Sequence, residues 1–190
     1  MMRSKLIDYL RVQGYVDDTN DKIVAIGLKR LGSLLCDLVF VLLLGLLLGD
    51  PFAGLLFELS YSIIRIYAGG YHAPTERICI WLTYISTFLC IVLILYLPLI
   101  PIAMHTLLGL SFMTMLLFSP VENANKPLST REKKVYRKKC LFLMLFEVLL
   151  YLVLVLFHSW VYARAICFAL TITAFGQIAD CLQRRIARLH

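Results

Sequence analysis

The feature that most constrains this chain is a series of apolar runs about as long as a lipid bilayer is thick. A membrane-spanning helix needs about 20 mainly apolar residues. Candidate spans occupy residues 31–48, 51–67, 80–97, 102–118, 140–157 and 160–182, of which 51–67 is the weakest. The chain is 61% hydrophobic, well above soluble domains. The sequence therefore predicts an all-α, polytopic membrane protein in which residues 1–190 form one domain with six transmembrane helices.

The N-terminal segment, residues 1–30, mixes charged and apolar residues and has no clean signal-peptide pattern. An amphipathic helix on the membrane surface is expected over residues 3–12. A second short helix is expected from the caps Thr19 and Asn20 toward Arg30. We therefore expect residues 1–30 to form short interfacial helices on the cytoplasmic side.

The connections between the spans alternate in character. The short ones are 49–51, 98–101 and 158–159, and the long polar ones are 68–79 and 119–139. In this arrangement all of the 19 Lys and Arg residues except Arg164 fall on the face with the long loops. The positive-inside rule then places both termini and both long loops in the cytoplasm. The net charge of +7 is thereby explained by topology, and no nucleic-acid partner is expected.

The first long loop carries a histidine and a cysteine seven residues apart, His72 and Cys79. Proline disfavours helix at the residue before it and is tolerated in a first turn, so a helix is expected to begin near Pro74. Cys79 would then lie about one turn into that helix, and His72 on a loop that can fold back beside it. Gly69 and Gly70 supply the backbone freedom for that return.

Such a placement would activate the thiol of Cys79. The thiolate is the nucleophile, and its pKa is lowered near a helix N-terminus and beside a protonated histidine. A Cys–His pair of this kind suits acyl transfer. The spacing alone leaves catalysis, metal binding and chance open.

These residues resemble the signature of a known family. Arg65, the run Gly69-Gly70-Tyr71-His72-Ala73 and Cys79 are similar to the motif of the AgrB family, the accessory gene regulator membrane endopeptidases of Gram-positive bacteria. The run PVENANKPL, residues 120–128, resembles a second loop of that family.

The resemblance implies an enzyme of peptide quorum sensing. It would cut the C-terminal part from an AgrD-like propeptide and help close the remaining segment into a cyclic thiolactone, without a cofactor or metal and as a homodimer. By position Cys79 would be the nucleophile and His72 the general base. Arg65, Gly69 and Gly70 would support them.

Further candidate residues surround this pair. Pro74 would start the helix, and Glu76 either orients His72 or complements the helix dipole. Glu122 and Asn123 are rival orienting groups. The basic segment from Arg131 to Lys139 is first expected to determine the topology. It is also a candidate binding site for an acidic tail of the propeptide. The substrate-binding candidates are Glu122, Asn123, Lys126, Lys133, Lys134, Arg137 and Lys138.

Two other classes of protein are compatible with the residues alone. A small six-helix transporter or channel could use the first long loop as a re-entrant segment. A membrane protein that binds a peptide without cleaving it would need no thiol. Glu58 and Glu147, inside expected spans, are interpreted as interhelical hydrogen-bonding partners, since ionisable groups in a membrane are usually paired.

Overall fold

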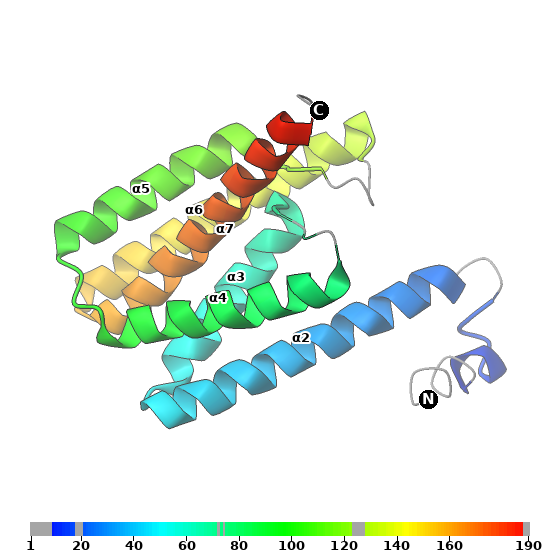
Figure 1. The fold of residues 1–190 in the computed structure, drawn as a ribbon, viewed down its shortest axis with the longest axis horizontal. Helices are drawn as coiled ribbons and strands as arrows, with labels where there is room; N and C mark the ends of the chain where they lie inside the picture. The colour runs from blue at the N-terminus through cyan, green and yellow to red at the C-terminus, as the bar shows by residue number, and fades with distance from the viewer. Residues whose placement is uncertain (1–8, 18–20, 72, 74, 123–127, 188–190) are drawn as a thin grey trace. The chain divides into compact units, whose positions relative to one another are not determined.

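The computed structural model describes residues 9–17, 21–71, 73, 75–122 and 128–187, and helices joined by loops make up this part of the chain. Within those residues there is no strand, which confirms the all-α prediction. A short helical segment occupies residues 9–12. The long helices are α2 (Asp21–Leu48), α3 (Pro51–Ala68), α4 (Glu76–Tyr96), α5 (Pro101–Phe118), α6 (Thr130–Leu156) and α7 (Trp160–Ala187), as Figure 1 shows.

The chain divides into two compact units, residues 1–40 and 41–190. In the first unit, Arg11 and Asp21 form an ion pair of 3.3 Å. The expected separate helix ending at Arg30 is wrong, because α2 runs without interruption from Asp21 to Leu48. No proline lies between these two residues, so nothing in the backbone forces a break. Most of the interfacial helix expected over residues 3–12 lies outside the described residues, as do Thr19 and Asn20, the expected caps of the second helix.

Five of these helices are long and apolar enough to cross a membrane, namely α2, α4, α5, α6 and α7. The protein is therefore a multi-pass membrane protein. Helix α3 is not among the five, although it has 18 residues, about 27 Å of rise. It carries Glu58 and Arg65 and is the expected span with the weakest apolar character. The count of six spans and the cytoplasmic placement of the termini stay predictions.

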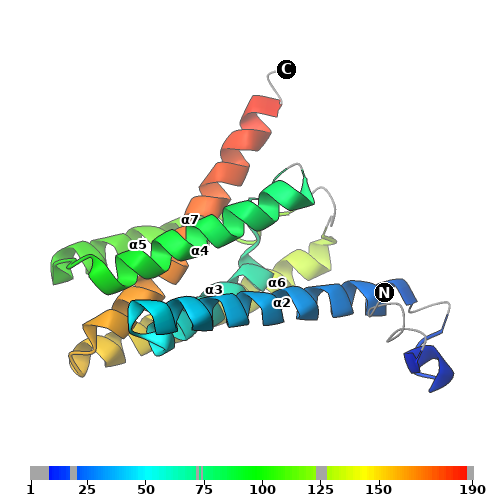
Figure 2. The ribbon, with the colours of Figure 1, turned by 60° about the horizontal axis from the view of Figure 1, so that its bottom comes forward.

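Helix α7 is the centre of the second unit. It packs against α3, α4, α5 and α6, and Figures 1 and 2 both show it running among them. Its buried residues include Ala163, Ala165, Ala169 and Ala174. Small side chains allow helices in a membrane to approach closely, where packing rather than hydrophobicity drives association. The alanines therefore explain why one helix can contact four neighbours.

Two carboxylates inside the second unit have polar partners. The Ser60 hydroxyl of α3 donates to Glu147 Oε2 of α6 at 3.1 Å, and both residues are buried. This confirms the interhelical role expected for Glu147. The Ser62 hydroxyl donates to Glu58 Oε1 at 2.6 Å within α3 itself, so this bond is not the interhelical one expected for Glu58.

The short connections meet at one end of the second unit. The Tyr96 hydroxyl donates to the carbonyl of Leu48 at 3.0 Å, and Arg164 Nη1 donates to the carbonyl of Leu97 at 3.0 Å. These bonds join the end of α4 to the end of α2 and to the start of α7. The long connections therefore lie at the opposite end, where the candidate site is found.

Candidate active site

Cys79 lies in the first turn of α4, where the sequence places it. The helix begins at Glu76, and its N-cap is Thr75, whose hydroxyl accepts from the backbone N–H of Ile78 at 3.4 Å. The Cys79 N–H donates to the Thr75 carbonyl at 3.1 Å. The predicted helix start near Pro74 is thereby confirmed. Cys79 is partly exposed and is not in a disulfide.

The partner expected for this thiol, His72, lies outside the described residues, as does Pro74. The forecast that the imidazole and the thiol come together therefore stays a prediction. Glu76 begins α4, but its side chain is also outside what is described, so the choice between a triad role and a dipole role stays open. The site is built from the residues on either side.

Arg65 reaches from the last turn of α3 to the backbone next to His72. Its Nη2 donates to the carbonyl of Tyr71 at 3.0 Å, and its Nη1 donates to the Tyr61 hydroxyl. The guanidinium carbon also lies 5.3 Å from the centre of the Tyr61 ring, within cation–π range. Arg65 therefore fixes the loop that leads to the histidine.

Gly69 ends α3 in a conformation that other residues do not adopt. Its φ is 73° and its ψ is −164°, a region occupied almost only by glycine. A Cβ on Gly69 would also overlap the carbonyl of Val121, a residue of the second long loop. Gly70 follows with a φ of 152°, also unfavourable for residues with a side chain. The two glycines thus allow the loop to turn and let the second loop pass close by.

Helix α7 holds the first loop from the other side. The Tyr71 N–H donates to the carbonyl of Gly176 at 2.9 Å. A Cβ built on Gly176 would lie 3.7 Å from the Tyr71 nitrogen and 3.9 Å from Arg65 Nη1. The backbone of Tyr71 is therefore fixed twice, through its N–H by α7 and through its carbonyl by α3.

Gln177 joins both long loops to α7. Its side chain is fully buried, and its Nε2 donates to the Ala68 carbonyl at 3.0 Å and to the Ser119 hydroxyl at 2.8 Å. The Val121 N–H also donates to the Ala68 carbonyl, at 2.9 Å. The sequence reasoning missed Gln177. An amide next to a glycine inside an apolar run was the available signal, since polar side chains in spans usually join helices.

The basic segment begins with a capped helix. Ser129 and Glu132 form a capping box, in which the Ser129 N–H donates to Glu132 Oε2 at 2.9 Å. Glu122 pairs with Lys133, with Oε1 2.9 Å from Nζ, and also accepts from the Leu128 N–H at 3.2 Å. The hydrogen bond from Lys133 lowers the pKa of the Glu122 carboxyl. Two substrate-binding candidates, Glu122 and Lys133, are thus partners of each other.

The remaining candidates are spread along the same segment. Lys134, Arg137 and Lys138 are exposed on the first turns of α6. Asn123 and Lys126 lie outside the described residues. No bond of the described residues joins these candidates to Cys79, so their contact with a substrate stays a prediction.

Cys79 lies close to the backbone N–H groups at the start of α4. The first backbone N–H groups of a helix have no partner within it, and together with the dipole they favour negative charge. The fold and the site together define a multi-pass helical membrane protein with a partly exposed thiol at the start of one helix.

Comparison with known proteins gives the family. The model of accessory gene regulator B matches residues 3–177, nearly the whole chain, and the protein belongs to this AgrB family. It is similar to two proteins of Clostridium perfringens named as AgrB-like. AgrB-like protein 2 of strain 13 is 26% identical over 178 residues, which cover 87% of this chain and 81% of the relative. The second, from strain SM101, is 27% identical over 131 residues, 65% of this chain and 61% of the relative. No solved structure gives a significant match.

Proposed function

We propose that this chain is a membrane-embedded cysteine endopeptidase that processes an AgrD-like propeptide for quorum sensing. The observation that carries the proposal is the position of Cys79, at the N-terminal turn of α4, in a chain that matches the AgrB family over residues 3–177. In this proposal the enzyme removes the C-terminal part of the propeptide and promotes closure of a thiolactone ring.

The first half of the reaction forms an acyl-enzyme. His72 takes the proton of the Cys79 thiol, and the thiolate attacks the scissile carbonyl. The peptide C–N bond then breaks, His72 gives its proton to the leaving amine, and the C-terminal fragment departs. The propeptide is left joined to Cys79 as a thioester. Backbone N–H groups at the start of α4 are candidates to stabilise the oxyanion.

The second half exchanges one thioester for another. A cysteine of the propeptide gives its thiol proton to His72 and attacks the acyl-enzyme carbonyl, the bond to Cys79 breaks, and the leaving thiolate of Cys79 takes up the proton from His72. Because both thioesters have similar energy, ring closure succeeds only when water is kept from competing. Ile78, Ile80 and Trp81, next to Cys79 on α4, are exposed apolar residues that would face lipid and not water.

Arg65, Gly69 and Gly70 act in this proposal as positioning residues. Arg65 binds the Tyr71 carbonyl, one residue before His72, and the glycines shape the return of the loop. The guanidinium is engaged by Tyr61 and Tyr71, which supports a role in holding the loop over a role as oxyanion donor.

The topology completes the proposal. The chain would cross the membrane six times, with α3 as the sixth span, and both termini and the active site would face the cytoplasm. A homodimer is the proposed assembly, on family grounds.

Co-expression with an AgrD-like propeptide tests the chemistry. The cleaved and cyclised products are followed by mass spectrometry for wild type, Cys79→Ala and His72→Ala, with Cys181→Ala as control. Cys181 is a partly exposed thiol of α7, and its loss should change nothing. Both site variants should abolish cleavage while the protein still reaches the membrane. Cleavage that persists in Cys79→Ala would show that the proposed nucleophile is wrong.

The basic start of α6 is proposed to hold the acidic tail of the propeptide. Replacing Lys133, Lys134, Arg137 and Lys138 with Gln should raise KM and reduce the salt dependence of processing, because exposed charges are screened by salt. Arg185→Gln, at the exposed end of α7, is the control. Unchanged processing by the fourfold variant, with unchanged topology, would contradict this role.

A further inference from the structure

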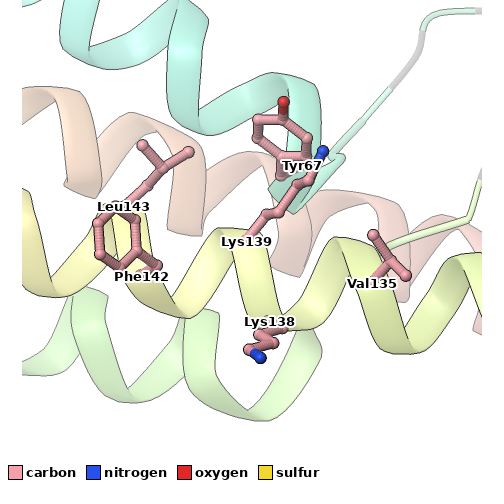
Figure 3. A pocket seen from close by; sticks show the side chains of 6 residues that line it. All are labelled: Tyr67, Val135, Lys138, Lys139, Phe142 and Leu143. Atoms are coloured by element: carbon pink, nitrogen blue, oxygen red, sulfur yellow. The ribbon is translucent and has the colours of Figure 1, made fainter.

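A groove lies where α6 changes from a basic to an apolar helix. It has a volume of about 460 Å³ and is lined, among the described residues, by Tyr67, Val135, Lys138, Lys139, Phe142 and Leu143 (Figure 3). Tyr67 comes from the last turn of α3 and the others from α6. Lys139 is the last basic residue of α6, after which only Glu147 is charged up to Leu156. The groove therefore crosses the level at which the helix enters the membrane.

The residues of α6 follow the spacing of a single helix face. Val135, Lys138, Lys139 and Phe142 lie at positions i, i+3, i+4 and i+7, so they form one stripe along α6. Lysines stand at one level of this stripe and the Phe142 ring one turn further into the apolar part. Phe142 is 71% exposed, although it is a large apolar side chain. The stripe thus presents positive charge at one level of α6 and, one helical turn further into its apolar part, an apolar surface.

The charges of the groove have no carboxylate partner in the described part of the chain. The Lys139 ammonium lies 5.2 Å from the centre of the Tyr67 ring, and Figure 3 shows it beside that ring. The Lys138 amine points away from Tyr67 in the same view, on a flexible stem that can turn. None of the six lining residues is acidic. The groove is therefore complementary to an anion.

We propose that this groove binds an anionic phospholipid of the membrane. The phosphate would lie at the ammonium groups of Lys138 and Lys139, and an acyl chain along Phe142 and Leu143. A phospholipid presents negative charge and hydrocarbon in the same vertical order as the stripe, whereas a peptide lying along the surface meets only one of the two layers. Basic pockets at the membrane boundary commonly bind anionic headgroups, and tyrosine favours the same level. The proposal does not depend on the peptidase activity. Lys138 is also a candidate for the acidic tail of the propeptide, so lipid and tail would compete at this one lysine, whereas Tyr67, Lys139 and Phe142 belong to the groove alone.

Native mass spectrometry of the full-length protein in detergent tests the proposal. Phosphatidylglycerol is titrated in one series and phosphatidylcholine in the other. The variant Lys138→Gln/Lys139→Gln is compared with Lys134→Gln/Arg137→Gln, which removes the same charge from the same turns of α6 outside the groove. The groove variant should weaken phosphatidylglycerol binding by roughly tenfold to thirtyfold, and the control variant by much less. Phosphatidylcholine binding should be weak throughout.

A second measurement, the rise in Tm on adding lipid, tests the proposal even where a variant is less stable than wild type. Phosphatidylglycerol should raise the Tm of wild type and of the control variant, because a ligand that binds only the folded state stabilises it. Phe142→Ala should reduce that rise without removing charge. Equal loss of lipid in both double variants would mean diffuse attraction and would overturn the site. Displacement of the lipid by an acidic amphipathic peptide that binds the groove more tightly would also overturn it, in favour of a peptide site.

Discussion

Gly69→Ala is the substitution for which the structure gives the sharpest expectation. Gly69 holds a φ of 73° and a ψ of −164°, where a residue with a Cβ is strained by about 1–3 kcal/mol. The new methyl group would also overlap the Val121 carbonyl, so that residue has to move. Moving it strains the bond from the Val121 N–H to the Ala68 carbonyl, worth about 1 kcal/mol net. The sum is about 2–4 kcal/mol.

This energy acts on the loop that carries His72. If the strain is relieved by local rearrangement, the loop leaves its working position while the helices remain folded. With 1.4 kcal/mol for each factor of ten, processing should fall by roughly thirtyfold to several hundredfold. If the strain is instead borne by the whole fold, the Tm should fall, because 2–4 kcal/mol is a large part of a typical free energy of unfolding.

The assay measures both quantities on the same preparation. Thermal unfolding in detergent is followed by tryptophan fluorescence, and processing by mass spectrometry. Gly109→Ala is the matched control, because Gly109 lies in α5 with open space around it, and alanine there should be neutral or stabilising by up to about 1 kcal/mol. A Gly69→Ala protein with wild-type Tm and wild-type processing would refute the reasoning, as would equal losses in both variants.

Three further outcomes follow from single contacts. Gln177→Leu should lower the free energy of unfolding by about 1–3 kcal/mol, because it removes two buried hydrogen bonds, to the Ala68 carbonyl and to the Ser119 hydroxyl, and denaturant unfolding in detergent measures this. Glu122→Gln should lower the Tm at neutral pH. That difference should disappear as pH falls through the lowered pKa of Glu122, because the pair with Lys133 stabilises only while the carboxylate is charged. Glu147→Ala should cost more stability than Glu147→Gln, which keeps an acceptor for the Ser60 hydroxyl; equal losses would contradict that bond's contribution.

Most helix positions could be predicted from the sequence, because long apolar runs and capping residues act locally. The capping box at Ser129 and the start of α4 at Glu76 follow from side chains within four residues of each helix end. The expected end of a separate helix near Arg30 is wrong, because no residue there stops the helix. Helix α2 contains no proline, and its three glycines do not interrupt it.

The site could be predicted only in part. The position of Cys79 near a helix start and the turn at Gly69 and Gly70 depend on neighbouring residues, so they could be predicted from the sequence. The contact of Gln177 with Ala68 joins α7 to the end of α3 across more than a hundred residues, and the bond from the Tyr71 N–H to Gly176 does the same for the loop. No local pattern specifies which residue of a distant helix meets the loop. Such contacts depend on packing, and their residues are visible in the sequence only as polar groups in apolar runs.

The contacts of Gln177 explain how a loop can interrupt the bundle at this depth. Helix α3 ends at Ala68, one residue beyond the expected span of residues 51–67. Its last carbonyls lack helical partners, and near a membrane such groups need partners from the protein itself. The Ala68 carbonyl receives the Gln177 amide and the Val121 N–H, and the Arg65 carbonyl receives the Gly69 N–H. The loop before Cys79 is therefore compatible with the membrane boundary because α7 and the second loop supply the hydrogen bonds that the broken helix has lost.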